Sequence, residues 1–353
     1  AERDTVSIVF FPFEYTPATF RLPAPVGGHT ATTLRNGSTL IAGGASRLSQ
    51  VGSAGLAFLL ESGRFQDTEL TMRQPRVGHT GTLLPDGRVL FLGGSQRYAD
   101  VNSEFTSLDD FVERVEIYDP LAETIEEIPV VGAPVRRANH TTFVTEVDGS
   151  TSVSVLLYGG VGDVSYNPPR LGLRDDLRTM VLENDTLFAV GPTFRFRFER
   201  IGGHSQTMLP PPNGQPELDA RLLVAGSDYV RADVVNPVFF ELDVSVENGL
   251  TQRAVEGFVE PRIGHAAARI VPFEFVGIFG GRGFVPTDVR GGAEAFVPKL
   301  GQFLAFPNSD EDDGERWGHT ATNWINGRIL LLGGFDSSGL ATDRAVFFGR
   351  LGR

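Results

Sequence analysis

All six histidines of this 353-residue chain occur in one repeated phrase. Its six versions, in chain order, are GGHTATTL, VGHTGTLL, ANHTTFVT, GGHSQTML, IGHAAARI and WGHTATNW, which contain His29, His79, His140, His204, His265 and His319. Successive histidines lie 50 to 64 residues apart. An internal period of this length is typical of solenoids, propellers and arrays. The sequence therefore predicts one structural unit that is repeated six times.

Each unit has the pattern of short antiparallel strands. After the histidine phrase comes a turn and then an apolar run that ends on glycine, such as STLIAGG (38–44) or RILLLGG (328–334). A third apolar run follows, such as LAFLLE (56–61) or VEIYDP (115–120), and a weaker fourth run precedes the next histidine. Four antiparallel strands make one propeller blade. Type I′ hairpin turns are predicted at Asn36-Gly37, Asp86-Gly87, Asp148-Gly149, Asn213-Gly214 and Asn326-Gly327.

This combination of phrase, hairpin and closing glycine doublet resembles the kelch repeat. The resemblance covers nearly the whole chain and implies an all-β fold, a six-bladed kelch-type β-propeller with four antiparallel strands per blade. The chain departs from the family pattern in the fourth repeat, where Gly226-Ser227 replaces the doublet. Of the aromatic pair of the family only Tyr118 remains, and the tryptophan position is taken by Phe65, Ile125, Phe198 and Phe258.

The repeats predict a single domain over residues 1–353 with no linker. The expected blades are approximately 27–75, 76–136, 137–200, 201–261, 262–315, and 316–353 together with 1–26. The last repeat has room for only three strands, so we expect VSIVFF (6–11) or ATFRLP (18–23) to supply its outer strand. Closure of this kind joins the first and last blades and removes free sheet edges.

Composition excludes several classes of function. The formal net charge of −13 argues against nucleic acid as the main partner, because phosphate contacts need a basic surface. The absence of cysteine excludes thiol catalysis, thiolate metal sites and the cross-linked cofactor of the galactose oxidases. No apolar run approaches the roughly 20 residues of a membrane span, so we expect no membrane insertion.

The candidate binding surface is the face that carries the loops between second and third strands. These loops are long, and long loops on a rigid scaffold commonly carry function. Arginines at the crossings between blades would add to this face, since converging guanidinium groups can bind carboxylates in a bidentate manner. In kelch adaptors such arginines surround the channel mouth, and the resemblance implies the same role here, with bracing of the blades as the alternative. The candidate ligand-binding residues are Arg76, Arg97, Arg137, Arg200, Arg262, Arg316, Tyr98, Tyr166 and Tyr229.

The histidines have two interpretations. Imidazole is a common metal ligand, but six rings from different blades cannot easily converge on one ion. We therefore expect structural histidines that bridge neighbouring strands or blades, and no metal or other cofactor. The acidic run 309–315 is expected to be a solvated turn, with Asp310, Asp312 and Asp313 as the candidates for calcium.

Two functions from different classes remain. We expect a non-catalytic binding or scaffold protein whose partner is a protein, an acidic peptide or a glycan. This protein could act alone or as a component of a larger assembly. The alternative is an acidic-sugar isomerase or mutarotase that resembles the kelch-type N-acetylneuraminate epimerases, in which arginines hold a carboxylate while another group moves a proton. No G-x-S-x-G, Walker loop, dinucleotide-binding glycine phrase or H-E-x-x-H occurs. The start at Ala1 favours a processed bacterial protein that is secreted, periplasmic or at the cell surface.

Overall fold

The structure is a computed structural model of the chain. It describes residues 13–48, 56–66, 70–98, 107–146, 151–166, 169–189, 193–195, 202–209, 220–231, 234–245, 249–254, 261–271, 273, 275–283, 285, 287–306 and 315–350. Within these ranges the regular structure is β-strand, apart from two single-turn 3₁₀ helices, η1 (Leu108–Asp110) and η3 (Ile325–Gly327). No helix in the described ranges is long and apolar enough to cross a membrane.

Each histidine phrase begins a sheet, and the first strand starts at the residue after the histidine. The first sheet contains β2 (Thr30–Thr33), β3 (Thr39–Ala42), β4 (Leu56–Glu61), β5 (Arg64–Phe65) and β6 (Leu70–Thr71). The second contains β7 (Thr80–Leu83), β8 (Val89–Leu92), β9 (Val115–Asp119) and β10 (Thr124–Ile128). The third contains β13 (Thr141–Glu146), β14 (Val153–Tyr158), β17 (Asp176–Glu183) and β18 (Thr186–Phe188), to which β11 (Val130–Val131) and β19 (Thr193–Arg195) add.

The other three sheets follow the same plan. The fourth contains β20 (Ser205–Leu209), β21 (Ala220–Arg231), β22 (Val234–Ser245) and β23 (Gly249–Ala254). The fifth contains β24 (Ala266–Ile270), β25 (Phe275–Phe279), β26 (Ala293–Val297) and β27 (Gln302–Ala305). The sixth contains β28 (Thr320–Asn323), β29 (Ile329–Leu332), β30 (Ala345–Arg350) and β1 (Phe13–Pro17). The prediction of an all-β chain built from antiparallel four-stranded sheets is confirmed.

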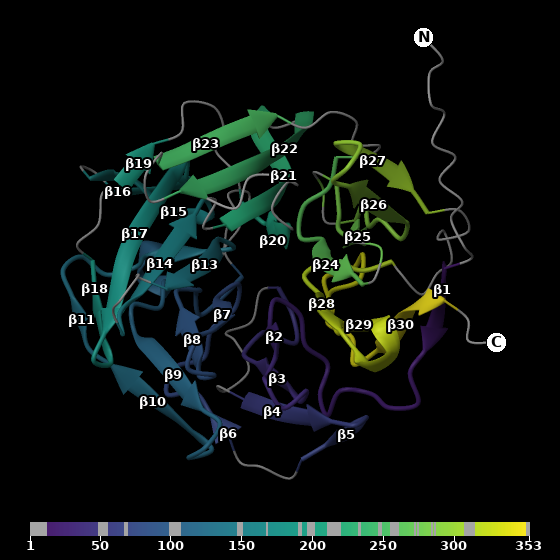
Figure 1. Ribbon diagram of the computed structural model, residues 1–353, viewed down its shortest axis with the longest axis horizontal. Coiled ribbons are helices and arrows are strands. Elements are labelled where there is room, and N and C mark those ends of the chain that lie inside the picture. The colour runs from purple at the N-terminus through teal and green to yellow at the C-terminus, as the bar shows by residue number, and fades with distance from the viewer. Residues whose placement is uncertain are drawn as a thin grey trace.

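The sheets stand around a common centre, with the histidine-following strand of each sheet innermost (Figure 1). Each of these strands contacts the corresponding strand of the next sheet, in the order β2, β7, β13, β20, β24, β28 and back to β2. The apolar cores lie between adjacent sheets. One core joins Leu40 and Phe91 of the first and second sheets, and another joins Phe279 and Phe348 of the fifth and sixth. Burial of these side chains holds the sheets face to face.

The chain start supplies the outer strand of the sixth sheet, because β1 pairs antiparallel with β30 from Phe13–Arg350 to Pro17–Val346. The predicted segment 18–23 follows this strand without belonging to it, and the other predicted segment, 6–11, lies outside the described residues. The physical reason is the alternation in FEYTP, which buries Phe13 and Tyr15 against Phe348 while Glu14 and Thr16 remain half-exposed.

The turn prediction needs a correction. Asn326 and Gly327 both have positive φ, 66° and 72°, as a type I′ turn requires. At Asn36-Gly37 and Asp86-Gly87 only the glycine does, at 85° and 96°. There the Asn36 and Asp86 side chains accept hydrogen bonds from the amides of Ser38 and Arg88, which favours a longer turn closed by glycine. Asp148-Gly149 and Asn213-Gly214 lie outside the described residues.

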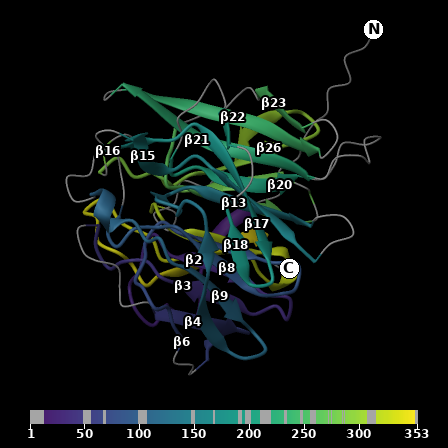
Figure 2. The same cartoon turned by 90° about the vertical axis from the view of Figure 1, so that its left-hand side faces the viewer.

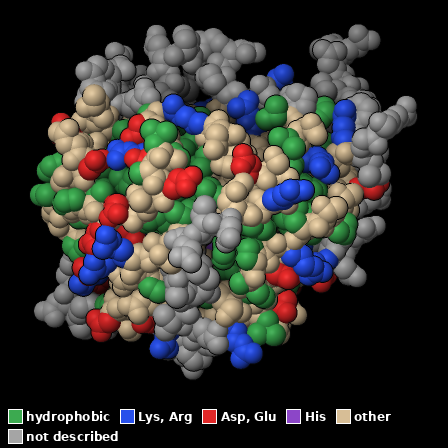
Figure 3. Space-filling view, turned by 90° about the horizontal axis from the view of Figure 1, so that it is seen from below, with side chains coloured by type: hydrophobic (Ala, Val, Ile, Leu, Met, Phe, Trp, Pro, Cys, Tyr) green, Lys and Arg blue, Asp and Glu red, His purple; other side chains and the backbone are tan. Residues whose placement is uncertain are grey.

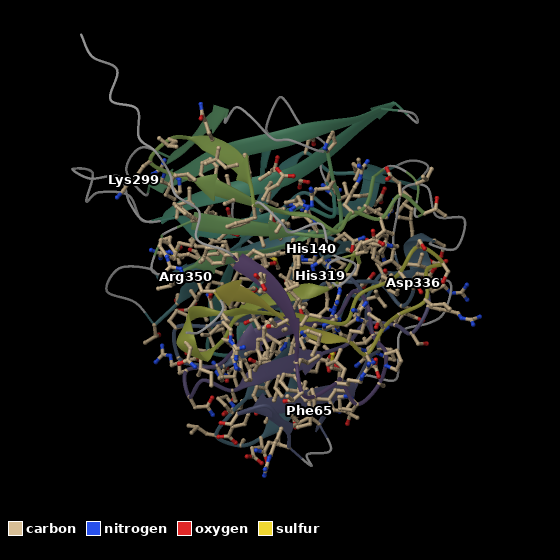
Figure 4. The ribbon with its side chains drawn as sticks, turned by 90° about the vertical axis from the view of Figure 1, so that its right-hand side faces the viewer. Phe65, His140, Lys299, His319, Asp336 and Arg350 are labelled. Atoms are coloured by element: carbon tan, nitrogen blue, oxygen red, sulfur yellow. The ribbon has the colours of Figure 1, made fainter. Side chains whose placement is uncertain are left out.

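The two ends of the ring differ. The loops between second and third strands form one face, here called the loop face, and the short turns between first and second strands form the other, the turn face. Figure 4 shows Asp336 of the loop face and Arg350 of the turn face on opposite sides, with His140 and His319 between them. A separate hairpin of β15 (Val161–Tyr166) and β16 (Pro169–Leu173), with β12 (Arg137–Ala138), adds to the loop face of the third sheet (Figure 2).

Candidate functional site

A closed circle of backbone hydrogen bonds surrounds the centre of the ring. The residue before each histidine donates its N–H to the carbonyl oxygen of its counterpart in the preceding sheet, at 2.6–3.0 Å. The donor–acceptor pairs are Gly28–Gly318, Gly78–Gly28, Asn139–Gly78, Gly203–Asn139, Gly264–Gly203 and Gly318–Gly264. All six residues have φ between 53° and 66°. This left-handed conformation explains why five are glycine, and Asn139 is the sixth because asparagine tolerates it better than most residues.

The histidines lie directly after this circle and reach from one sheet to the preceding one. In four cases Nε2 is within hydrogen-bond distance of the hydroxyl that follows the preceding histidine. The pairs are His29–Thr320 (3.2 Å), His79–Thr30 (3.2 Å), His204–Thr141 (2.9 Å) and His265–Ser205 (2.8 Å). These contacts are those expected of bridging, structural histidines.

His140 and His319 depart from this pattern. At the position that should serve His319 the chain has Ala266, which carries no hydroxyl. Thr80 occupies the position that should serve His140, but its Oγ1 lies 2.8 Å from Oγ1 of Thr142 instead. Neither ring nitrogen of His140 or His319 has a hydrogen-bond partner in the described part of the chain.

Burial lowers the pKa of every histidine. The pKa of His29 is lowered to about 4, and those of His204 and His265 to about 3, because burial removes water from the charged imidazolium. The pKa values of the other three, His79, His140 and His319, are lowered well below 6.5 by burial and then by the nearby arginine charges. All six rings are therefore neutral at pH 7.

A cavity of about 160 Å³ lies on the axis. It is lined by Tyr98, by the six residues of the backbone circle and by the six histidines. Tyr98 belongs to the loop face, where its ring packs edge-on against Trp317 and Phe335, with centroids 5.3 and 5.9 Å away. The Arg282 guanidinium lies over Trp317 at 4.6 Å. Tyr98 was expected at a ligand-binding mouth, but it is buried in this aromatic cluster.

The crossing arginines are buried inside the sheets. Arg76 pairs with Glu116, Arg137 with Asp176 at 2.9 Å, and Arg262 with Glu294 at 2.7 Å. The same guanidinium groups donate to carbonyls of their own sheet, such as Gly93 for Arg76 and Gly280 for Arg262. Arg316 donates to Gly333 and Arg344.

These contacts correct the expectation that two or more crossing arginines face an opening. Arg76, Arg137, Arg262 and Arg316 are each at most 3% exposed and already hold carboxylate or carbonyl oxygens. The physical reason is the position three residues before histidine, which aims the side chain under the closing glycine doublet. Burial lowers the pKa of Arg137 and of Arg316 to about 10, so both remain charged at pH 7. The partners named above belong to their own sheets, whereas the alternative considered for them was bracing of neighbouring blades.

The remaining candidates are placed as follows. Arg97 lies half-buried on the loop face, where its carbonyl accepts the Ser95 hydroxyl. Tyr166 and Tyr229 are within β15 and β21, but their side chains lie outside what the structure describes. Arg200, Asp310, Asp312 and Asp313 also lie outside the described residues. Among the described residues, no group of three or more histidine, aspartate or glutamate side chains is arranged to hold a metal ion.

The acidic partners of the arginines were not singled out from the sequence. Glu116, Asp176 and Glu294 lie at the start of the third strand, 32 to 40 residues after their arginines. Asp176 also accepts from Arg174 at 2.6 Å, and although burial raises its pKa, these two arginines outweigh burial and lower the pKa to about 2. A signal was present in two repeats, because Glu116 and Glu294 each interrupt an otherwise apolar third run.

A groove on the loop face of the second sheet was also not predicted. It has a volume of about 350 Å³ and is lined by Gln74, Gln96, Leu108, Asp109, Phe111, Glu113, Arg114 and Arg136. A second groove of about 450 Å³ shares Glu113 and Arg114 with it and continues over Ile128 to Pro134. Polar and apolar groups alternate along both grooves, and two exposed ion pairs, Arg136–Glu113 and Arg114–Glu127, cross between them.

Comparisons with known proteins identify the fold but no family. No family model matches the chain, and no curated protein matches it. A solved structure described as "Structure of YjhT" superposes with a TM-score of 0.64, covering 92% of this chain and 95% of that chain at 15% sequence identity. The described sheets are therefore arranged in the fold of that protein, a finding that concerns fold alone.

Proposed function

We propose that this chain is a six-bladed kelch-type β-propeller, closed by its N-terminal strand, that binds a protein, a peptide or a glycan through its loop face without catalysing a reaction. The observation that carries the proposal is the use of the repeated polar residues. The histidines, the crossing arginines and the circle of backbone amides are buried and bonded between or within sheets, with His140 and His319 as the exceptions. The groups that vary between repeats, and so can recognise a partner, are in the loops.

The two joined grooves of the second sheet are the proposed point of contact. Their volumes of about 350 and 450 Å³ lie within the range of ligand sites, and their mixed lining suits an amphipathic segment. Because the crossing arginines are already paired, they give no reason to prefer an acidic peptide. The outer side of the ring near β4 and β5, seen in Figure 3, has basic, acidic and apolar side chains interspersed and no large patch of one charge.

The test measures binding to glycan and peptide arrays by the whole protein and by two matched variants. Gln96→Trp fills the groove on the loop face, whereas Gln302→Trp places the same side chain on the exposed edge of β27 near the turn face. We expect Gln96→Trp to lose at least tenfold in affinity for any bound ligand and Gln302→Trp to retain it. Equal affinity for both variants, or loss in Gln302→Trp alone, would refute the loop face as the binding surface.

The alternative, an acidic-sugar isomerase or mutarotase, is separated by a different measurement. An enzyme of that kind accelerates exchange between the anomers of an acidic sugar, which NMR magnetisation-transfer experiments detect directly. We expect no acceleration with N-acetylneuraminate at micromolar protein. Accelerated exchange that Gln96→Trp abolishes would replace the binding proposal with the catalytic one.

A further inference from the structure

The bonds between histidines and hydroxyls leave out two of the six junctions, and these two are opposite each other. His140 belongs to the third repeat and His319 to the sixth, so two repeats lie between them in either direction around the ring. Both side chains lie at mid-depth between the loop face and the turn face (Figure 4). The cause of the exception differs at the two junctions: Ala266 lacks the hydroxyl, whereas the hydroxyl of Thr80 pairs with Thr142.

Both rings therefore present two unused nitrogens inside the protein. His140 and His319 are 4% and 6% exposed, and none of their four ring nitrogens has a partner within the described ranges. A neutral imidazole carries one N–H donor and one nitrogen acceptor. Buried groups of this kind almost always have a hydrogen-bond partner in folded proteins, from the chain or from ordered water.

The axial cavity is the space that both histidines line. Its volume of about 160 Å³ admits about five water molecules at the roughly 30 Å³ that each occupies in the liquid. Among the described residues, its lining contains no aspartate, glutamate, arginine or lysine. We propose that this cavity binds a hydrogen-bonded cluster of water molecules that His140 and His319 hold from opposite sides of the axis.

The chemistry of the lining selects water over an ion. A neutral imidazole pair offers donors and acceptors in equal number, and water supplies both. A cation would need carboxylates or a set of converging ligands, and the described residues form no group of three or more that could hold a metal. An anion would need accessible positive charge, but the guanidinium groups of Arg76, Arg137 and Arg262 are held by carboxylates. The guanidinium group of Arg316 is buried and donates to the carbonyl oxygens of Gly333 and Arg344.

A crystal structure of the whole protein at better than 1.5 Å tests the proposal, with parallel crystals soaked in sodium bromide or zinc chloride. We expect ordered water within 3.2 Å of a ring nitrogen of both His140 and His319, and no anomalous signal from bromide or zinc in the cavity. A dry cavity, or a bromide or zinc peak on the axis, would overturn the proposal.

Installing the missing hydroxyl gives an independent test in solution. Ala266→Ser restores the group that Thr30, Thr141 and Ser205 provide at other junctions, and Ala267→Ser makes the same change one position along β24. With histidine labelled by ¹⁵N, we expect Ala266→Ser to shift the ring nitrogens of His319 while His140 stays unchanged, and to displace the water at His319 in the crystal. Ala267→Ser should leave both rings unchanged.

Unchanged His319 signals in Ala266→Ser would contradict the proposed geometry. If Ala266→Ser fails to fold, Thr142→Ala performs the same test at the opposite junction. It frees the Thr80 hydroxyl to bond His140, and the third repeat then carries alanine where Ala31, Ala267 and Ala321 stand in other repeats. The ring nitrogens of His140, and not those of His319, should then shift, and a His140 signal that stays in place refutes the assignment.

Discussion

The pair Arg76–Glu116 should be the most sensitive ionic contact in the protein. Both side chains are 0% exposed, and Glu116 also accepts the backbone N–H of Arg73 at 2.6 Å. Replacing Glu116 by glutamine keeps the shape but leaves the Arg76 charge without a counter-charge. Because breaking one partner of a buried pair strands a charge away from water, we expect a loss of about 3 kcal/mol in the free energy of unfolding.

Urea denaturation at pH 7.5, followed by tryptophan fluorescence, measures this loss. The matched control is Glu126→Gln in the same sheet, whose partner Arg73 forms an exposed pair at 2.8 Å with side chains 56% and 61% exposed. Exposed pairs contribute little, so we expect a change below about 0.5 kcal/mol. If Glu116→Gln and its control lose similar amounts, the pair does not lie in the desolvated environment described above.

The first sheet supplies a natural replacement for the pair. Val26 stands three residues before His29, and Phe58 lies opposite Ile41 in the register where Glu116 lies opposite Phe91. The double variant Arg76→Val with Glu116→Phe copies that arrangement. It should be more stable than Glu116→Gln, since no buried charge remains, and a double variant that is less stable would contradict the account of desolvation.

Three further outcomes are expected. The six histidines have folded-state pKa values below 6.5, so the unfolded chain binds protons first on acidification and the free energy of unfolding falls below pH 6.5. Urea titrations between pH 6.5 and 5 should give a slope that approaches about 1.4 kcal/mol per pH unit for each histidine. A free energy of unfolding that does not change over this range would refute the prediction. Gly78→Ala should lower the melting temperature more than Gly301→Ala. Both glycines have φ near 64°, but only at Gly78 would the new Cβ clash with Oδ1 of Asn139. Equal decreases in melting temperature would count against the backbone circle. EDTA should leave the melting temperature unchanged at pH 7.5. His265→Ala should lower the free energy of unfolding by about 1–3 kcal/mol, because the contact with Ser205 is lost. A melting temperature that falls with EDTA in the original protein, but not in this variant, would identify a metal site.

The strands could be predicted because their signals are local. LAFLLE at 56–61 coincides with β4, the third strand of the first sheet. The histidine phrases and the glycine doublets located the first and second strands of the sheets to within a few residues. An N-terminal outer strand of the last sheet was predicted, but the segment 18–23 proposed for it lies after β1, where Phe13 and Tyr15 pack against β30 at the far end of the chain. The alternation in these five residues is compatible with a strand, but it does not identify a partner more than 300 positions away.

The crossing arginines show that the position of a residue within a repeat does not determine where its side chain points. The sequence locates Arg76 and Arg262 at equivalent places in their repeats, but not whether the side chains run outward or under the glycine doublets. That direction depends on Glu116 and Glu294, whose separation from the arginines changes with the length of the intervening loop. A variable spacing hides the pair from any search for fixed motifs, although each member recurs in register with its own strand.

The polar centre of the ring follows from its geometry. The innermost strands of six sheets meet around one axis, where the backbone circle and the histidines surround a cavity, and the apolar cores lie further out between the sheets. Hydrogen bonds must then hold the centre, and five glycines, Asn139 and four histidine–hydroxyl pairs do so. A polar residue that recurs in every repeat is therefore explained by the hydrogen bonds that the centre of the ring needs. Residues that recognise a partner are therefore expected where the repeats differ, in the loops, and the junctions of His140 and His319 are the two places where the central pattern itself changes.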